Sequence, residues 1–310
     1  MIDQLLDSSV LIGIAASGIR LATPYLYAAI GETFGQRSGV LNLGVEGIML
    51  MGAFSGFWAV YVSGSLVLGV LAALFVGLLM GLGTAFINVT LKAEQGISGI
   101  GIFLFGLGLS ELLFQQSFDS VVTVNGFPKI RVPVLSEVPV IGEIFFQHNL
   151  LVYVAFALVP IAWFVLNRTT LGLKIRAVGQ NPQAADAMGI SVARVRYLTV
   201  TFGGMMAAMA GASLSIALLN VFQQNMTAGQ GFIAVALVYF GSWRPFGVMA
   251  GALLFSTVNA LQLWVRTKGI DIPAEYASMA PYLLTILALV LASQRVDQPA
   301  ALTKPFERGE

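Results

Sequence analysis

A carboxylate and an amide lie close together in an apolar part of the chain, at Glu46 and Asn42. Both belong to the stretch SGVLNLGVEGIMLMGA, residues 38–53, which is otherwise small and hydrophobic. Residues four apart on a helix share one face, and a carboxylate at the centre of a membrane costs on the order of 2.5 kcal/mol or more. We therefore expect Asn42 and Glu46 to line a solute path between helices. The alternative is a structural ion pair of Glu46 with Arg20.

A second polar cluster occupies residues 219–232, LNVFQQNMTAGQGF, where amide side chains alternate with phenylalanines. Amides hydrogen-bond sugar hydroxyls and the edges of nucleobases, and aromatic rings stack on heterocycles. The segment is therefore a candidate for contact with a solute, although an outer loop between two spans would also be rich in amides for solubility. The candidate residues are Asn220, Phe222, Gln223, Gln224 and Asn225.

The stretch LGLKIRAVGQNPQAADAMGI, residues 171–190, is polar and basic within an otherwise apolar sequence. Asn181 can cap a helix, Pro182 suits its first position, and Gly189 can provide a left-handed exit. One short helix between Asn181 and Gly189 is therefore expected. Cations flank it on both sides, which is typical of cytoplasmic loops, and we place residues 168–196 in the cytoplasm. The flanking cations are Lys174, Arg176, Arg194 and Arg196.

This pattern resembles the cytoplasmic coupling loop of permease subunits from ATP-binding cassette (ABC) importers, in the branched-chain amino acid, simple sugar and nucleoside group. The stretch around Glu46 is similar to nucleoside-type permeases, in which a glycine-rich NxGxEG helix follows an ERSG-like turn. Here the turn reads QRSG at residues 36–39, with Gln in place of Glu. The resemblance covers about residues 20–293 and includes the segments RVPVLSEVPVIGEIFFQ and SMAPYLLTILALV.

The resemblance implies a permease subunit that couples external ATPases to substrate translocation. It implies four kinds of partner: a second homologous permease, cytoplasmic ATP-binding subunits, an extracytoplasmic substrate-binding protein and membrane lipids. A nucleoside is the leading substrate, and simple sugars, riboflavin-like heterocycles and branched-chain amino acids are the alternatives. The residues expected to couple to the ATPase are Asn181, Pro182, Ala184, Ala185, Asp186 and Gly189.

Composition places the chain in the cell membrane, because 57% of its 310 residues are hydrophobic and only 10% are charged. The net charge of +1 gives no general attraction for nucleic acid. Cysteine is absent and His148 is the only histidine, so thiolate nucleophiles and multi-histidine metal sites are excluded, and no cofactor is expected. The sequence contains no GxxxxGK[ST] motif, so this chain is not expected to be an ATP-hydrolysing enzyme.

The apolar segments predict an all-α bundle of eight or nine membrane crossings, some of them broken, within a single transmembrane domain over residues 1–310. Arg20 divides the first span at about 9–31, and residues 242–245 divide the stretch 229–265 into two pieces. The cytoplasmic tail, residues 294–310, is expected to be frayed. The remaining spans are expected at about 39–62, 65–90, 97–117, 149–167, 195–219 and 277–293.

The longest polar interruption is residues 118–147, in which three prolines are spaced so that no regular helix fits. Counting crossings back from the coupling loop places it outside the membrane. A proline-rich segment of this length is unusual without a function, so we expect it to contact the substrate-binding protein through its only cations, Lys129 and Arg131. The alternative is a lid that only seals the bundle.

A different class of function is an ion- or proton-coupled secondary transporter of a small polar solute, with Glu46 or Glu111 as its titrating group. That alternative explains the carboxylates but gives no role to the capped helix, whereas an ABC permease needs a rigid element to transmit the closure of its ATPases. Glu111 also fits the hydrated end of a span. A membrane enzyme is disfavoured because no cysteine, second histidine or GxSxG motif is present.

Overall fold

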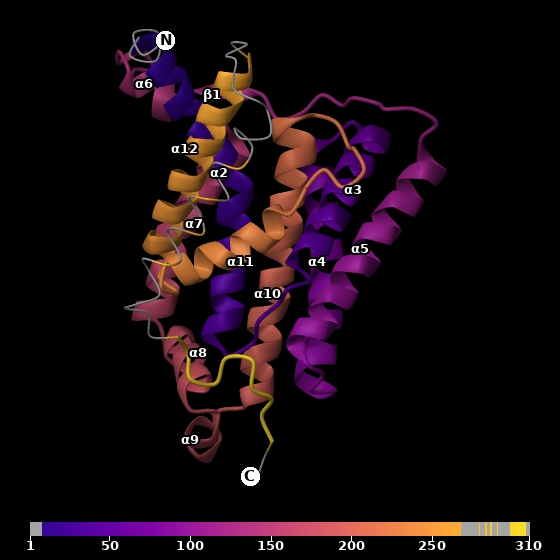
Figure 1. The fold of residues 1–310 in the computed structure, drawn as a ribbon, viewed down its shortest axis with the longest axis vertical. Coiled ribbons are helices and arrows are strands. Elements are labelled where there is room, and N and C mark those ends of the chain that lie inside the picture. The colour runs from indigo at the N-terminus through magenta and orange to yellow at the C-terminus, as the bar shows by residue number, and fades with distance from the viewer. Residues whose placement is uncertain are drawn as a thin grey trace.

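The chain forms an elongated helical bundle (Figure 1). The computed structural model describes residues 8–267 and 298–307, with four isolated positions between these ranges. Within the described residues, seven helices are long and apolar enough to cross a membrane, which confirms the expected membrane bundle. They are α2 (Ser8–Arg37), α3 (Val45–Ser63), α4 (Leu66–Ala85), α5 (Gln95–Ser117), α7 (Leu150–Arg168), α10 (Val192–Ser213) and α12 (Pro245–Thr267).

Shorter elements connect the long helices. A π-helical turn extends α4 and another extends α10, at Phe86–Thr90 and Leu214–Leu218. The predicted span at 277–293 falls almost entirely outside the described residues, so the number of crossings stays a prediction. The other short elements are β1 (Lys129–Arg131), a 3-10 turn (Leu135–Glu137), α6 (Ile141–Phe145), β2 (Gln147–Asn149), α8 (Thr170–Gln180), α9 (Pro182–Ala187) and α11 (Gln230–Phe240).

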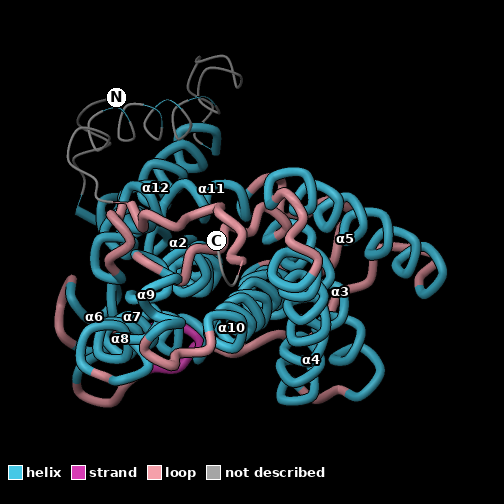
Figure 2. Tube along the Cα trace, turned by 90° about the horizontal axis from the view of Figure 1, so that it is seen from below, coloured by secondary structure: helices cyan, strands magenta, loops and turns pink. Residues whose placement is uncertain are grey.

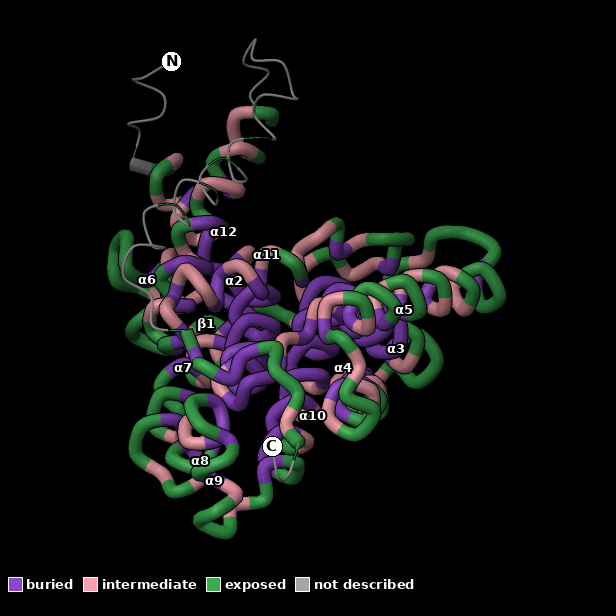
Figure 3. Tube along the Cα trace, turned by 60° about the horizontal axis from the view of Figure 1, so that its bottom comes forward, coloured by how far each residue is buried: buried purple, intermediate pink, exposed green. Residues whose placement is uncertain are grey.

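Helix α10 lies at the centre of the bundle and packs against α2, α3 and α4 (Figure 2). Within the most apolar 18-residue stretch of each span, 78% of the residues are buried in α3 and in α10, but only 22% are buried in α4 and in α5. Figure 3 shows the same contrast between a buried centre and an exposed α5. Because α4 and α5 are strongly apolar, with mean hydropathies of 2.5 and 1.9, their exposed side chains suit contact with lipid.

The contact between α3 and α10 depends on glycine. A Cβ added at Gly211 of α10 would overlap the main-chain oxygen of Met49 in α3. Close approach of this kind lets helices associate where lipid provides no hydrophobic drive. By contrast, a Cβ at Gly83 of α4 would meet no atom within 4 Å.

Gly211→Ala is expected to destabilise the protein by about 1–3 kcal/mol, because the clash is with backbone and can be relieved only by moving a helix. The matched control is Gly83→Ala, which gains up to about 1 kcal/mol of helix propensity without a clash. Thermal unfolding of both purified variants in detergent measures the difference. Equal melting temperatures would contradict the close contact.

The first span differs from the prediction, because α2 continues without a break through Arg20 and through the polar residues 31–37. The guanidinium of Arg20 donates from Nη2 to Ser17 Oγ at 3.1 Å, so Arg20 has a hydrogen-bond partner within its own helix. It does not form the ion pair with Glu46 that we considered as an alternative. Polar side chains are tolerated within a span where they face the bundle and find partners, as Arg20, Thr33 and Gln36 of α2 do.

The outer segment, residues 118–147, is ordered as expected, but it holds more regular structure than its prolines suggested. Strand β1 pairs with β2 in antiparallel register, with Ile130 opposite His148. Helix α6 follows Pro139, so the expectation that no helix fits was wrong for these five residues. The segment lies at the end of the bundle opposite α8 and α9 (Figure 1). The two loops are thus on opposite sides, as the crossing count predicted.

The tail was expected to be frayed, and this was wrong for residues 298–307. The amide of Ala301 donates to Gly179 O at 2.9 Å, and the amide of Thr303 donates to Gly39 O at 3.1 Å. The guanidinium of Arg196 donates to Lys304 O at 3.1 Å. These residues therefore connect α8, the turn after α2 and the start of α10.

Candidate functional site

Glu46 is buried in the first turn of α3, with only 1% of its surface exposed. One carboxylate oxygen, Oε1, accepts hydrogen bonds from Thr227 Oγ1 at 2.6 Å and from the amide of Gly229 at 2.7 Å. The other, Oε2, accepts one from the amide of Gly231 at 2.5 Å. The carboxylate thus lies at the N-terminal ends of both α3 and α11, where helix dipoles favour negative charge. Its position is explained without a cationic partner.

Asn42 and Glu46 do not share a helical face as predicted, because α3 begins only at Val45. Asn42 lies in the preceding turn, where its Oδ1 accepts a hydrogen bond from the amide of Gly44 at 2.9 Å. An Asn side chain that bonds the backbone two residues later competes with helix formation, which explains the late start of α3. The main-chain amide of Asn42 also donates to Glu32 Oε1 at 3.0 Å.

Glu32 is a second buried carboxylate that the sequence analysis did not identify, since GETFGQRS resembled a loop. Gln36 Nε2 donates to Glu32 Oε1 at 3.0 Å, and Trp243 Nε1 donates to Gln36 Oε1 at 2.7 Å. The i, i+4 spacing of the two α2 residues could have revealed the pair. This network also explains Gln in place of Glu at position 36, because a second carboxylate there could not donate to Glu32.

The amide-rich segment separates into a buried and an exposed part. Phe222 is fully buried, with its ring 5.1 Å from that of Phe114 and 5.5 Å from that of Phe54. Asn220 also faces the interior, and its Oδ1 has no partner within the described residues. The exposed side chains are Gln223, Gln224 and Asn225. Of the predicted residues, only these three have exposed amides in this conformation, and the ring of Phe222 is fully buried among other rings.

The loop carrying these amides runs from the top of α10 down to the start of α11 inside the bundle (Figure 1). At its outer end, the amide of Val124 donates to Asn220 O at 3.0 Å, which joins the loop to the outer segment. Helix α11 has 11 residues and a length of about 16 Å, too short to cross a membrane. The loop and α11 thus form a broken element that begins within the bundle.

The capped helix predicted between Asn181 and Gly189 is confirmed as α9. Asn181 Oδ1 accepts a hydrogen bond from the amide of Ala184 at 2.9 Å, and Pro182 occupies the first helical position. Gly189 has a φ of +80°, the left-handed exit that was predicted. The preceding residues form a further helix, α8, which we did not predict. Gly172 and Gly179 obscured it, yet both are buried where the helix packs closely.

Helix α9 has a buried side and an exposed side. Pro182 and Ala185 face the protein, whereas Ala184 is exposed and Asp186 is half-buried. Met188 follows the helix and is 82% exposed, and the sequence analysis did not select it. Helix α9 lies at one end of the molecule (Figure 1), so a large exposed apolar side chain directly after it suits a contact with another protein.

Lys129 and Arg131 are exposed and lie two residues apart on β1, so they point to the same face of the strand. His148 of β2 lies nearby but is buried, and its Nε2 is 2.7 Å from Ile144 O. Burial lowers the pKa of His148, so its imidazole is neutral at pH 7. The positive charge of this surface therefore comes from the lysine and the arginine.

Sequence comparison assigns the family. The sequence model of a protein family, described as the permease component of branched-chain amino acid transport systems, matches residues 14–289 of this chain. The chain belongs to this permease family. The permease is therefore a multi-pass protein of the cell membrane, in agreement with the seven long apolar helices found among its described residues. No solved structure matches it.

Three relatives match the permease over nearly their whole length. TsgC13 of Haloferax volcanii, whose name assigns it to glucose transport, is 38% identical over 96% of this chain and 98% of its own. The guanosine ABC transporter permease protein NupQ of Bacillus subtilis is 36% identical, as is the nucleoside ABC transporter permease protein NupC of Lactococcus lactis. Both alignments cover 93% of this chain and 94% of the relative. These relatives are permease subunits, so the ion-coupled alternative loses its support.

Proposed function

We propose that the permease imports nucleosides as the membrane-spanning subunit of a binding-protein-dependent ABC importer. The observation that carries this proposal is the pre-formed helix α9, capped at both ends and projecting from one end of the bundle. Relatives that are named for guanosine and nucleoside transport match 93% of the chain, which supports the substrate class. In this assignment the ATP-binding subunits hydrolyse ATP, and the permease carries no catalytic site.

The partners have separate places on the molecule. We assign the ATP-binding subunits to α9 and the substrate-binding protein to the surface of β1. A second homologous permease completes the pathway, and lipid covers the exposed faces of α4 and α5. The poor burial of these two spans supports contact with lipid or with another membrane helix.

For the substrate path we retain the predicted residues but divide their roles. The exposed amides of Gln223, Gln224 and Asn225 can hydrogen-bond the sugar hydroxyls and base edges of a nucleoside. Asn42 and Glu46 act indirectly, since their polar atoms hold the turn before α3 and the loop before α11. Asn220 and Phe222 support the loop from inside.

Uptake by proteoliposomes tests this function. The vesicles would hold the permease with its partner permease and ATP-binding subunits, and would be supplied with the binding protein and labelled guanosine. We expect uptake that needs ATP and is competed by other nucleosides but not by glucose. A second candidate is sugar import, favoured by the 38% identity to TsgC13. ATP-dependent uptake of labelled glucose, without uptake of labelled guanosine, would establish that candidate and refute the nucleoside proposal.

Reversing both cations of β1, as Lys129→Glu with Arg131→Glu, is expected to slow docking of the loaded binding protein about tenfold at low salt. Exposed charges govern the association rate more than the final affinity. Stopped-flow association with the assembled importer measures the rate. Exchanging the two residues, as Lys129→Arg with Arg131→Lys, retains the charge and is the control. An unchanged rate at every salt concentration would favour a lid that only seals the bundle.

A further inference from the structure

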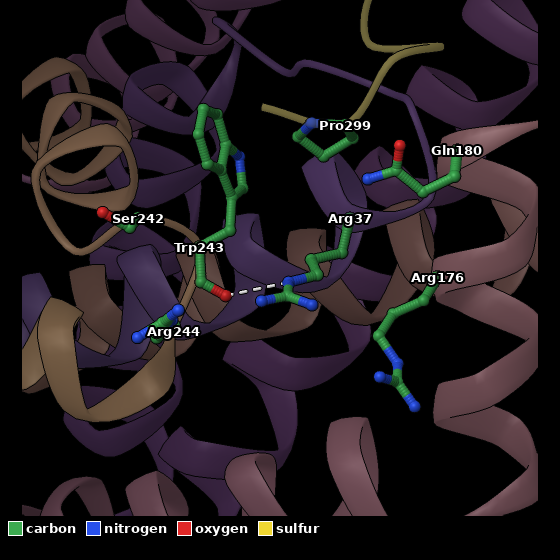
Figure 4. Close-up of a pocket in the computed structure, with 7 residues that line it drawn as sticks. All are labelled: Arg37, Arg176, Gln180, Ser242, Trp243, Arg244 and Pro299. Carbon is green, nitrogen blue, oxygen red and sulfur yellow. Dashed lines mark hydrogen bonds between the residues drawn. The ribbon is translucent and has the colours of Figure 1, made fainter. Parts of the chain in front are cut away.

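A polar pocket with a volume of about 450 Å³ lies at the cytoplasmic end of the bundle. Three arginines from different elements line it: Arg37 ends α2, Arg176 lies in α8, and Arg244 lies in the turn between α11 and α12 (Figure 4). Gln180 and Trp243 complete much of the wall. The three guanidinium groups are brought together by folding, because they are far apart in the sequence.

Two of the arginines are held in place by the main chain. The Nε of Arg37 donates to Trp243 O at 2.9 Å, and the Nε of Arg176 donates to Gly172 O at 3.4 Å. In both arginines, the terminal guanidinium nitrogens Nη1 and Nη2 have no hydrogen-bond partner within the described residues. These nitrogens form the planar fork that binds two oxygens of a phosphate or carboxylate at once. The two guanidinium groups are therefore held in a fixed orientation, and no acceptor from the described residues binds their terminal nitrogens.

The charge of the pocket is unbalanced. None of the residues that line it is acidic, and none of its three arginines forms a salt bridge within the described part of the chain. Like charges that converge in a partly enclosed space repel one another, so this arrangement favours an anion between them. The geometry points to a bound group with several negative or polar oxygens.

The level of the pocket identifies the source of such an anion. Arg37 is the last residue of one membrane-spanning helix, and Arg244 immediately precedes another. Phe246 lies 6.2 Å from Trp163, ring to ring, and both are partly exposed. Arg168 stacks over the Trp163 ring at 5.8 Å. Aromatic and basic residues gather in this way at the level of lipid headgroups.

We propose that Arg37, Arg176 and Arg244 bind the phosphate of an anionic phospholipid from the cytoplasmic leaflet. Basic pockets between membrane helices on the cytoplasmic side are suited to such headgroups, and the arginine fork matches phosphate oxygens. A headgroup there would connect the end of α2 with α8 and with the turn before α12. Because α8 leads directly into α9, the lipid would also steady the projecting helix.

Native mass spectrometry of the full-length permease in a neutral detergent tests this proposal. The delipidated protein would be titrated with phosphatidylglycerol, with phosphatidylcholine and with inorganic phosphate. We expect one phosphatidylglycerol to bind more tightly than the other two. Arg176→Gln with Arg244→Gln should weaken it about tenfold or more, since each charge-assisted hydrogen bond is strong.

Two further variants make the result specific. Lys174→Gln with Arg194→Gln removes two exposed cations from the same side of the membrane but outside the pocket, and should leave phosphatidylglycerol binding unchanged. Arg176→Lys with Arg244→Lys retains the charge but removes the fork, and should bind with intermediate affinity. Arg37 is left intact because it also holds Trp243.

Three results would overturn the proposal. Inorganic phosphate that binds as tightly as the lipid would show a site for free anions. Equal loss of lipid in the Lys174 and Arg194 variant would show general attraction of cations to anionic lipid. Unchanged lipid binding in the Arg176 and Arg244 glutamine variant, combined with weaker retention of the ATP-binding subunits, would show that the pocket receives a protein carboxylate.

Discussion

Met188→Asp is expected to weaken the association of the ATP-binding subunits about thirtyfold and to abolish most ATP-driven uptake. Met188 is 82% exposed at the end of the projecting helix, so its apolar surface is free for a partner to cover. Truncating or charging a central contact of this kind costs about 2 kcal/mol of binding free energy or more. Titration of the detergent-solubilised permease with the ATP-binding subunits measures the affinity, and uptake by proteoliposomes measures the consequence.

Two variants separate docking from folding. Met188→Leu retains an apolar side chain of similar volume and should bind nearly as the wild type does. Ala185→Trp with Gly189→Val should also abolish uptake, but for a different reason: Ala185 is buried and Gly189 has a φ of +80° that a β-branched residue cannot adopt without strain. That double variant should show locally increased proteolysis around α9, whereas Met188→Asp should not. Normal uptake by Met188→Asp would refute this docking surface.

Helix α9 could be predicted from sequence because its determinants are local. Asn181 caps residues within its own first turn, and Gly189 ends the same helix. The bundle as a whole followed from hydropathy for a similar reason, since each span is long enough to be recognised alone. Helix α8 was missed because its glycines are favourable only where neighbouring backbone approaches, as Gly179 approaches Arg37 O. That contact depends on tertiary structure.

The interior of the candidate path could not be predicted in the same way. The partners of Glu46 lie 181 to 185 residues later in the chain, so no local pattern indicates them. We considered an ion pair with Arg20 because side chains of opposite charge attract each other. The structure instead satisfies this carboxylate with amides and a hydroxyl. Similarly, Phe222 resembled a stacking surface, but Phe54 of α3 and Phe114 of α5 pack against its ring and the side chain is fully buried.

Glu46→Gln is expected to lower the free energy of unfolding by about 3 kcal/mol or more, and the melting temperature with it. Glutamine is uncharged, and its NH₂ group must replace either Oε1 or Oε2. In one orientation it faces the amide of Gly231, and in the other it faces the amide of Gly229, so one buried N–H always loses its acceptor. A lost acceptor costs about 1–3 kcal/mol, and hydrogen bonds to a charged group contribute about 1.5–3 kcal/mol each.

Thermal unfolding in detergent measures this loss, and two further substitutions define its cause. Glu111→Gln changes a carboxylate that, among the described residues, accepts only from Gln115 at 3.3 Å, so its melting temperature should stay near that of the wild type. Adding Arg20→Gln to Glu46→Gln should not restore stability, because Arg20 bonds Ser17 instead of Glu46. Restored stability in this double variant would instead indicate an ion pair between Arg20 and Glu46. A Glu46→Gln variant that melts normally but fails to transport guanosine would contradict this stabilising role and show that the carboxylate acts in translocation, because its loss would then affect transport without affecting the fold.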